Sequence, residues 1–437
     1  MASETTTPSV APPPASSIGR ALRRARIVGN FALVQAAVQA ISFLSGILVV
    51  RTLAQHEYAY FTIANTMQGT MNLLADIGIS VGLVSIGGRV WQDRYRFGQL
   101  INTALNLRKQ FGILVVLAVS PVMYFMLVKN GASFFYSIVL ISIVLIGVMF
   151  QFAIGVFDVV PRLRSDIGRI QMIDFTGALT RLIALAILLL VFLNAGLAIA
   201  VAASISVLQY LMYRSYATRV VDLTAPQNSE DRAEIVRLTK HLAANSIFYC
   251  FQGQITVFLI SFFAHRSAAV AEVGALGRLA MIFTILTNLL TNIFVPAFAR
   301  CQQKHKLRLL YLGITGGVAA FSAIIILGAW LLPNEFLFVL GNKYAHLYRE
   351  FLLMVAGAVL AALTGTFWAL NASKAWVAGA WLYIPLTLIT QVLLIPYTNF
   401  ASVTGVLIFN LLSALPNLLL NLAMSWRGFK SLQPLPV

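Results

Sequence analysis

The sequence predicts an all-α membrane protein that crosses the bilayer about twelve times, in two bundles of six helices. Composition, the length of the apolar segments and the distribution of the basic residues all indicate this fold. Hydrophobic residues make up 59% of the 437 residues and charged residues 10%. Ordinary soluble domains contain about 25% charged residues. The composition therefore excludes a soluble globular protein.

The apolar segments are long enough to cross a membrane. A helix needs about 20 residues to span a hydrocarbon core of about 30 Å. The segments are continuous apolar runs without strict alternation, which excludes a transmembrane β-barrel. In chain order, the predicted spans are Asn30–Val50, Tyr58–Ile86, Phe111–Leu127, Phe134–Phe157, Met172–Leu193, Ala198–Tyr213, Ser246–Ala264, Val273–Ala299, Leu309–Leu332, Phe351–Asn371, Trp376–Tyr397 and Val403–Trp426.

The basic residues fall on one side of this topology. Of the 31 Lys and Arg, 24 lie in the tails and in the loops on the N-terminal side of the membrane, and five lie in the opposite loops. By the positive-inside rule, both termini are expected in the cytoplasm. The net charge of +17 is therefore explained by topology, and we do not expect a nucleic-acid partner.

The chain divides into five predicted parts. Residues 1–27 are expected to be a disordered basic cytoplasmic tail, because their first part is rich in Ser, Thr, Pro and Ala. The N-terminal bundle is expected at 28–213, a cytoplasmic linker at 214–243, the C-terminal bundle at 244–426 and a second tail at 427–437. Within the linker, Ser229–Leu242 is predicted to be an amphipathic helix with its apolar face on the membrane surface.

The first helix of each half shows a possible repeat. A shift of 215 residues pairs Asn30 with Asn245, Gln39 with Gln254 and Arg51 with Arg266. Six helices per half give both halves the same orientation, so the predicted pseudo-two-fold axis runs along the membrane normal.

Arg181 lies near the middle of the fifth span, where an arginine costs about 2.5–3.5 kcal/mol on insertion scales. Asp174 lies seven residues earlier on the same face. Two interpretations remain open from the residues alone. Arg181 pairs with a carboxylate on another helix, or it lines a central cavity for an anionic substrate.

Arg278 is predicted to line the same cavity from the eighth span. Glu272 precedes it by six residues, and Asn288 adds a polar group further along the span. A local pairing of Glu272 with Arg278 would have to reach across almost two turns. Arg51 and Arg266 fit interfacial anchors better than ligands.

Further polar side chains interrupt the apolar spans and should face other helices or a wet cavity. Those predicted to line the cavity are Gln39, Gln254, Asn72 and Asn417. The amides around Asn417 could equally hold helices together. Asp76 is interpreted as a proton or sodium site, or as a partner of a nearby arginine or helix terminus. The coupling-ion candidates are Asp76, Asp174 and Glu272, and the sequence predicts no metal site and no cofactor.

Several segments resemble the polysaccharide-transport (oligosaccharide flippase) family of the multidrug/oligosaccharidyl-lipid/polysaccharide (MOP) exporter superfamily. The resemblance rests on Arg51–Tyr58 after the first span, on Leu74-Ala75-Asp76-Ile77-Gly78 and on the hairpin from Val273 through Arg278 to Pro296. It implies a MATE-like fold. It also implies a cationic cavity, and by position this role is carried over to Arg278 and Arg181.

The resemblance implies translocation of a polyprenyl-pyrophosphate-linked oligosaccharide across the bacterial cytoplasmic membrane, for surface polysaccharide biosynthesis. The expected partners are this anionic lipid-linked oligosaccharide, membrane lipids and the polysaccharide polymerase or chain-length machinery. A cation-coupled multidrug exporter of the same fold is the alternative function. A polyprenyl-sugar polymerase or ligase fits less well, since the largest predicted outer segment, Pro333–Glu350, is small for a catalytic domain.

Overall fold

The computed structural model describes residues 17–190, 192–264, 266–290, 294–301 and 303–431, except for the side chains of 17–32, 285, 288 and 289. All regular elements in these residues are helical. The N-terminal half comprises α1 (Ser17–Thr52), α2 (Gln55–Asp76), α3 (Ile79–Val90), α4 (Arg94–Lys129), α5 (Phe134–Phe157), α6 (Val159–Leu163), α7 (Ile167–Leu189) and α8 (Ala195–Val220).

Eight residues, 221–228, connect α8 to the C-terminal half. It comprises α9 (Ser229–Phe263), α10 (Ser267–Leu279), α11 (Ile282–Leu289), α12 (Val295–Arg300), α13 (Lys304–Leu331), α14 (Pro333–Leu340), α15 (Tyr348–Ser373), α16 (Tyr383–Leu394) and α17 (Val403–Ser431), with short 3₁₀ helices at Asn342–Tyr344, Ala380–Leu382 and Ile395–Tyr397.

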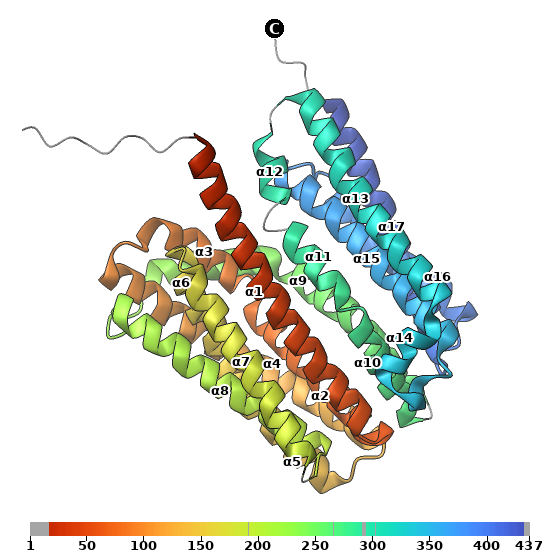
Figure 1. Ribbon diagram of the computed structural model, residues 1–437. Helices are drawn as coiled ribbons and strands as arrows, with labels where there is room; N and C mark the ends of the chain where they lie inside the picture. The colour runs from red at the N-terminus through yellow and green to blue at the C-terminus, as the bar shows by residue number, and fades with distance from the viewer. Residues whose placement is uncertain (1–16, 191, 265, 291–293, 302, 432–437) are drawn as a thin grey trace, which may run out of the picture.

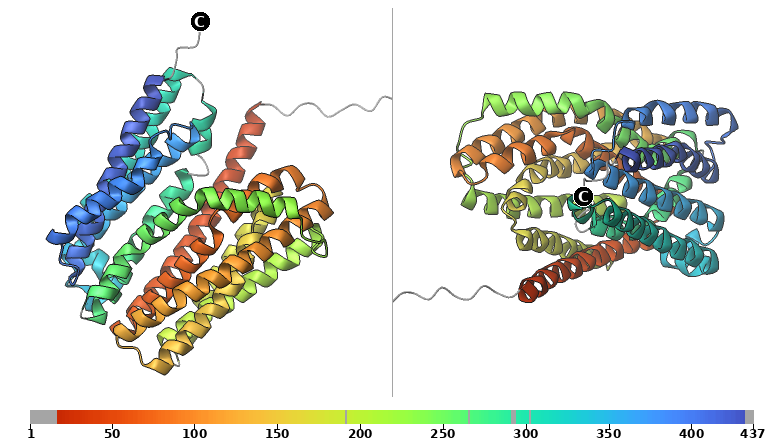
Figure 2. Two further views of the ribbon diagram at one scale, coloured as in Figure 1. Left: turned by 180° about the vertical axis from the view of Figure 1, so that it is seen from behind. Right: turned by 90° about the horizontal axis from the view of Figure 1, so that it is seen from above.

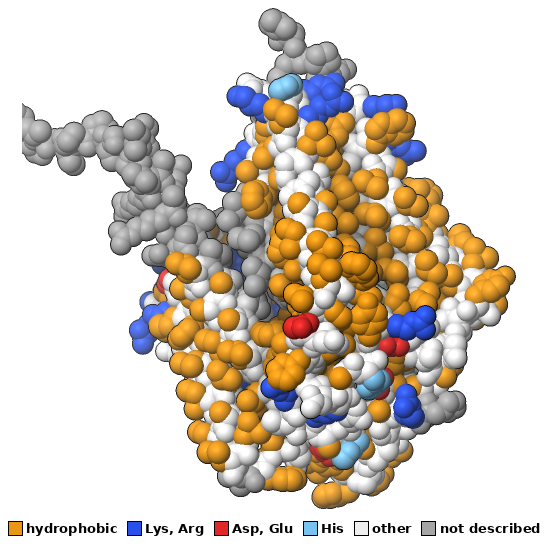
Figure 3. All heavy atoms as spheres, turned by 45° about the vertical axis from the view of Figure 1, so that its right-hand side comes forward, with side chains coloured by type: hydrophobic (Ala, Val, Ile, Leu, Met, Phe, Trp, Pro, Cys, Tyr) orange, Lys and Arg blue, Asp and Glu red, His pale blue; other side chains and the backbone are white. Residues whose placement is uncertain are grey.

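Eleven segments in the described part of the chain are long and apolar enough to cross a membrane, or twelve if the bent pair α2 and α3 counts as one span. On the face shown in Figure 3, apolar side chains cover the middle, Lys and Arg lie at the upper end, and Lys and Arg lie together with Asp, Glu and His in the lower part. The predicted polytopic all-helical membrane protein is confirmed.

The two halves lie side by side, with α1 on one face of their junction and α9 on the other (Figures 1 and 2). We call the end where α1 begins and α17 finishes the tail end, and the end where the turn after Thr52 joins α1 to α2 the hairpin end. The helix order repeats between the halves. Displaced by 215 residues, α5 falls on 349–372, and α15 covers Tyr348–Ser373.

The second span differs from the expected single helix. The segment predicted as Tyr58–Ile86 is divided into α2 and α3, whose axes are bent by 47°. Gly78 lies at the break with φ +87°, a left-handed conformation that glycine adopts without steric cost. A Cβ atom at this position would lie 3.0 Å from Leu242. The bend directs α3 along the tail end, against α4 and α9.

The eighth span is also interrupted. The segment predicted as Val273–Ala299 contains three helices, and the first break follows Leu279 directly. There the backbone makes i to i−3 hydrogen bonds, from Met281 N to Arg278 O at 3.2 Å and from Phe283 N to Ala280 O at 3.1 Å. Such tightened turns within a span are typical of functional sites and hinges.

The linker helix does not lie on a membrane surface, contrary to the sequence-based expectation for Ser229–Leu242. It is the first part of α9, which continues into the seventh span as one helix of 35 residues. Its apolar face packs on protein: Ile235 is fully buried, and a Cβ atom at Gly82 would lie 2.9 Å from it. Gly82 of α3 allows this close approach, so the linker is docked on the N-terminal half.

The helices also extend beyond the expected tail boundaries. α1 begins at Ser17, inside the segment 1–27 that we expected to be a disordered tail, and α17 continues to Ser431, inside the expected tail 427–437. Each extension continues a membrane-spanning helix past its apolar part. The division into bundles at 28–213 and 244–426 stays a prediction.

Candidate functional site

The fifth span, α7, has one apolar face and one face that carries Arg181. Its exposed apolar side chains recur at helical spacing and mark the face that would contact lipid: Met172, Phe175, Leu179, Ile183 and Ile187. Arg181 follows Met172 by nine residues, about two and a half turns, and so lies on the opposite side of the helix. Its Nε atom is buried without a hydrogen-bond partner. In the part of the chain that the structure describes, no carboxylate lies within ion-pair distance of it.

Arg278 reaches from α10 to the opposite half of the molecule. Its Nε donates to the Tyr58 hydroxyl at 3.4 Å, and its Cζ lies 5.8 Å from the centre of the Phe61 ring. On the α1 side, a Cβ atom at Gly46 would lie 3.4 Å from the Arg278 Cδ. The side chain therefore lies between the two halves, held by α1 and α2.

The alternative considered for Arg278, a local pairing with Glu272, does not form. Glu272 is buried and lies 3.4 Å from His346 Nε2 instead. Arg278 is thus left without a carboxylate partner among the described residues. Arg181 is buried and also lies within reach of the positive charge of Arg278, so the two guanidinium groups repel each other. An anion placed between them would relieve this repulsion.

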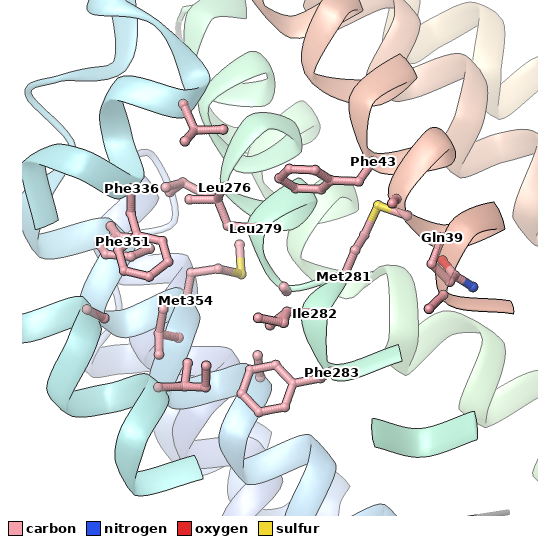
Figure 4. A pocket seen from close by; sticks show the side chains of 18 residues that line it. Gln39, Phe43, Leu276, Leu279, Met281, Ile282, Phe283, Phe336, Phe351 and Met354 are labelled. Atoms are coloured by element: carbon pink, nitrogen blue, oxygen red, sulfur yellow. The ribbon is translucent and has the colours of Figure 1, made fainter. Parts of the chain in front are cut away.

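An apolar cavity of about 310 Å³ lies beside the α10–α11 break, lined by residues on both sides of it. Its walls come from both halves: Phe43 on α1 lies across from Phe351 and Met354 on α15, with Leu276 and Leu279 between them (Figure 4). Gln39 is the polar side chain among its described lining residues. The cavity therefore suits an apolar group, and Arg278 is the sequence neighbour of Leu279, one of its lining residues.

Two other predicted polar residues take part in contacts within or between bundles. Gln254 approaches α2 of the opposite half, where a Cβ atom at Gly69 would lie 3.9 Å from its Nε2. Asn72 donates to Gln151, which donates to Ser206 at 3.2 Å. This second chain of contacts lies inside the N-terminal half, away from the junction.

Asn417 lies in a network that joins α15 to α17. Its side chain and carbonyl both accept from Asn421 at 2.9 Å, Asn371 donates to the Asn421 carbonyl at 2.9 Å, and Ser425 donates to Asn371 at 2.8 Å. These contacts correspond to the helix-joining alternative. The side chain of Asn288 lies outside the described part of the structure.

The three coupling-ion candidates are separated from one another. Asp76 forms an ion pair with Arg108 at 3.2 Å and accepts from the Ser80 hydroxyl at 2.7 Å. Asp174 lies in the N-terminal half within reach of the charges of Asp158 and Arg162. Glu272 lies beside His346, so the three carboxylates have different neighbours and do not form one site. Their role in ion coupling stays a prediction.

Sequence reasoning missed two features of this region. Arg108, which we assigned to a basic loop, is buried within α4 beside Asp76, because α4 begins at Arg94. Tyr58 and Phe61 surround Arg278 from a span 220 residues away. Hydropathy could not have paired these residues, although aromatic side chains near the start of α2 offered a weak signal.

The polar contacts between the halves gather at the hairpin end. Arg51 Nε donates to the carbonyl of Val339 at 2.9 Å. The other contacts have a similar form, in which a long polar side chain reaches the opposite half: Lys343 to Leu53, Gln55 to Lys343, Lys129 to Phe262 and Asn130 to Ser261. We call this set the hairpin-end contacts. They close the junction on that side of Arg278.

Solved transporters share this arrangement of helices. An inward-facing multidrug resistance MATE family transporter of the MOP superfamily matches with a TM-score of 0.64, over 92% of this chain and 99% of its own, at 14% identity. The lipid II flippase MurJ in an inward closed conformation matches with a TM-score of 0.72, over 92% of this chain and 89% of its own, at 10% identity. The chain has the MOP-transporter fold.

Another neighbour is a MOP superfamily transporter from Pyrococcus furiosus, described as having a binding pocket of reverse polarity that suggests a different function. It matches with a TM-score of 0.58 over 92% of this chain and 95% of its own, at 15% identity. No family model and no curated sequence matches the chain. The expected MATE-like fold is confirmed, and the polysaccharide-transport branch remains a proposal.

Proposed function

We propose that this protein is a flippase for a polyprenyl-pyrophosphate-linked oligosaccharide. The observation that carries the proposal is the pair formed by Arg181 and Arg278, two arginines at the junction of the halves with no carboxylate partner among the described residues. A pyrophosphate supplies the missing negative charge. The planar guanidinium groups donate hydrogen bonds in pairs, a geometry that fits phosphate oxygens.

The apolar cavity supports the same substrate class. A lipid-linked oligosaccharide carries a long hydrocarbon chain directly on its pyrophosphate, so it needs apolar space beside the cations. Leu276, Leu279 and Ala280 line the cavity, and Arg278 lies among them in the sequence. The end of α10 and the turn after it therefore supply both apolar side chains and a cation. In the proposed cycle the polyprenyl chain stays in apolar surroundings while the headgroup crosses between the halves by alternating access.

The predicted orientation gives the movement a direction. With the termini in the cytoplasm, the headgroup moves from the tail end towards the hairpin end. An inside-negative potential favours outward movement of an anion by about 2.3 kcal/mol per charge per 100 mV. Opening requires the hairpin-end contacts to separate, because they lie across the exit.

A multidrug exporter of the same fold is the second candidate. The apolar cavity, with Gln39 as the polar side chain among its described lining residues, would also suit an apolar drug. Such an exporter would use one of the buried carboxylates for ion coupling, and Glu272 beside His346 is the best placed for this role. The two functions differ in the charge of the substrate that the arginines favour.

Reconstituted vesicles distinguish the two functions. A fluorescent polyprenyl-pyrophosphate disaccharide is incorporated, and the fraction accessible to a membrane-impermeant reductant is followed over time. We expect Arg181→Ala and Arg278→Ala each to slow translocation at least tenfold, which is about 1.4 kcal/mol, and we expect both to abolish surface polysaccharide export in cells. Arg214→Ala, which removes an exposed arginine of α8, serves as the control and leaves the rate unchanged.

Two results would reject the proposal. Normal translocation by both alanine variants would show that the arginines do not bind the headgroup. Transport of a cationic dye, undiminished or increased in the same variants, would favour the exporter. Variants that fail to accumulate in the membrane would assign the arginines a structural role instead.

A further inference from the structure

A second pocket lies on the outer surface of the N-terminal half, between α7 and α8 at the tail end. Its volume is about 290 Å³. Arg169 stands in the first turn of α7, and Arg219 in the last turn of α8. Ser215 and Tyr216 add hydroxyl groups beside them, while Met172 and Leu211 form an apolar part towards the middle of the membrane. We call this the α7–α8 pocket.

The pocket opens towards lipid, away from the junction of the halves. Met172, at its apolar part, begins the exposed stripe on α7, and Arg181 is on the other side of that helix. Leu211 on α8 is 54% exposed, as expected for a lipid-facing side chain. The α7–α8 pocket is therefore separate from the substrate site proposed above.

The charges at the pocket are mainly positive. The Cζ of Arg169 lies 5.5 Å from the centre of the Tyr216 ring, a cation–π contact that holds the guanidinium at the pocket. Asp166 is the acidic group nearby: it caps α7, and its charge and that of Arg164 both reach the Tyr216 hydroxyl. In the described part of the chain neither Arg169 nor Arg219 forms an ion pair.

We propose that the α7–α8 pocket binds an anionic glycerophospholipid from the leaflet at the tail end. The lipid phosphate lies between Arg169 and Arg219, where guanidinium groups donate to its oxygens. Ser215 is placed to donate to the phosphate or the glycerol. One acyl chain follows Met172 and Leu211 into the apolar region. The combination of paired cations at the membrane boundary and an apolar groove below them fits a phospholipid better than a free ion.

The test uses the full-length protein in a neutral detergent. Phosphatidylglycerol is the probe, with phosphatidylcholine as the lipid that lacks net charge. Thermal unfolding and native mass spectrometry give the shift in Tm and the number of lipids retained. We expect phosphatidylglycerol to raise Tm and to be retained at one more molecule per chain than phosphatidylcholine.

The double variant Arg169→Gln/Arg219→Gln should lose that extra molecule and most of the Tm shift. Lys306→Gln/Arg308→Gln is the matched control, because it removes two exposed cations from the tail end of α13, away from any described pocket. The control should keep both the lipid and the shift. Arg169→Lys/Arg219→Lys should keep the lipid but retain it more weakly. This variant tests whether positive charge alone, without the guanidinium geometry, is sufficient for binding.

Three outcomes would overturn the proposal. The first is equal retention of phosphatidylglycerol by the Gln variant and the wild type, counted only on folded chains. The second is an equal effect of phosphatidylcholine. The third is an equal Tm shift with inorganic phosphate alone, which would make the pocket a phosphate site. Translocation by the Gln variant is measured separately, so failure here does not affect the proposed substrate site.

Discussion

The two ends of the molecule hold their segments together by different chemistry. At the hairpin end, Arg51 and Lys343 donate to main-chain carbonyls of the opposite half, and Arg51 is exposed to solvent. At the tail end, the linker part of α9 is fixed to the N-terminal half by Arg96 and Asp231. Their two hydrogen bonds measure 2.5 and 2.6 Å, and the Asp231 side chain is only 3% exposed.

This difference indicates which contact can open. Water can replace a carbonyl acceptor or a solvent-exposed donor, so separating the hairpin-end contacts costs little. Separating Arg96 from Asp231 would leave a buried carboxylate without a partner, which is expensive. We therefore expect the hairpin end to separate during transport while the linker stays docked.

The largest expected effect comes from the linker. Asp231→Ala leaves the Arg96 guanidinium without its carboxylate and should lower the free energy of unfolding by about 2–3 kcal/mol, because the Arg96 side chain is 28% exposed and water can partly replace its partner. Thermal unfolding in detergent measures this change. Arg89→Ala breaks the exposed pair with Glu234 and should cost at most about 1 kcal/mol.

The double variant Arg96→Met/Asp231→Leu sharpens this prediction. Removing both charges avoids leaving the Arg96 guanidinium without its carboxylate, so it should be more stable than Asp231→Ala alone. If Asp231→Ala and Arg89→Ala cost the same, the linker is not held more firmly than an ordinary surface contact. That result would mean that the tail end is not held more strongly than the hairpin end.

A steric change at the linker should have an intermediate effect. A Cβ atom at Gly98 would lie 1.9 Å from the carbonyl oxygen of Asp222, so Gly98→Ala must displace the start of the linker. We expect a loss of stability of about 1–3 kcal/mol. Gly88→Ala is the control, since it has no atom within 4 Å of the new Cβ and should be neutral or slightly stabilising. Equal stabilities of the two variants would contradict the close approach.

The smallest effect on stability is expected at the hairpin end. Arg51→Gln/Lys343→Gln should change the free energy of unfolding by less than about 1 kcal/mol, because the lost contacts are replaced by water. It should nevertheless open that end more often. Maleimide labelling of Leu340→Cys, a fully buried position there, measures this in a background without Cys250 and Cys301. Unchanged labelling would show that these contacts do not hold the end closed.

The spans could be predicted because the length of an apolar segment can be taken directly from the hydropathy of the sequence. Hydropathy does not show whether the helix is continuous along that segment. The breaks at Gly78 and after Leu279 lie inside apolar runs: the first packs against Leu242 of α9, and the second is a tightened turn of the backbone. The linker helix was placed on a membrane surface for a related reason, since an apolar face looks the same whether it packs on lipid or on α3.

The candidate site could be predicted in part. Arg181 and Arg278 were recognised because a charge within an apolar span is costly. Whether each has a partner depends on helices distant in the sequence, such as the contact of Arg278 with Tyr58. The hairpin-end contacts were not foreseen, because their acceptors are main-chain carbonyls, which every residue carries.

The continuity of α9 has a mechanical consequence. A helix of 35 residues is about 52 Å long, and this one is clamped near its start by Asp231 and Ile235 and runs on as a member of the C-terminal half. If the two halves tilt relative to each other, this rod is forced to flex, most of all in the stretch after Leu242, where its packing on Gly78 ends. The bent helix would store elastic energy and release it when the halves return. In this way α9 would oppose the tilting of one half against the other.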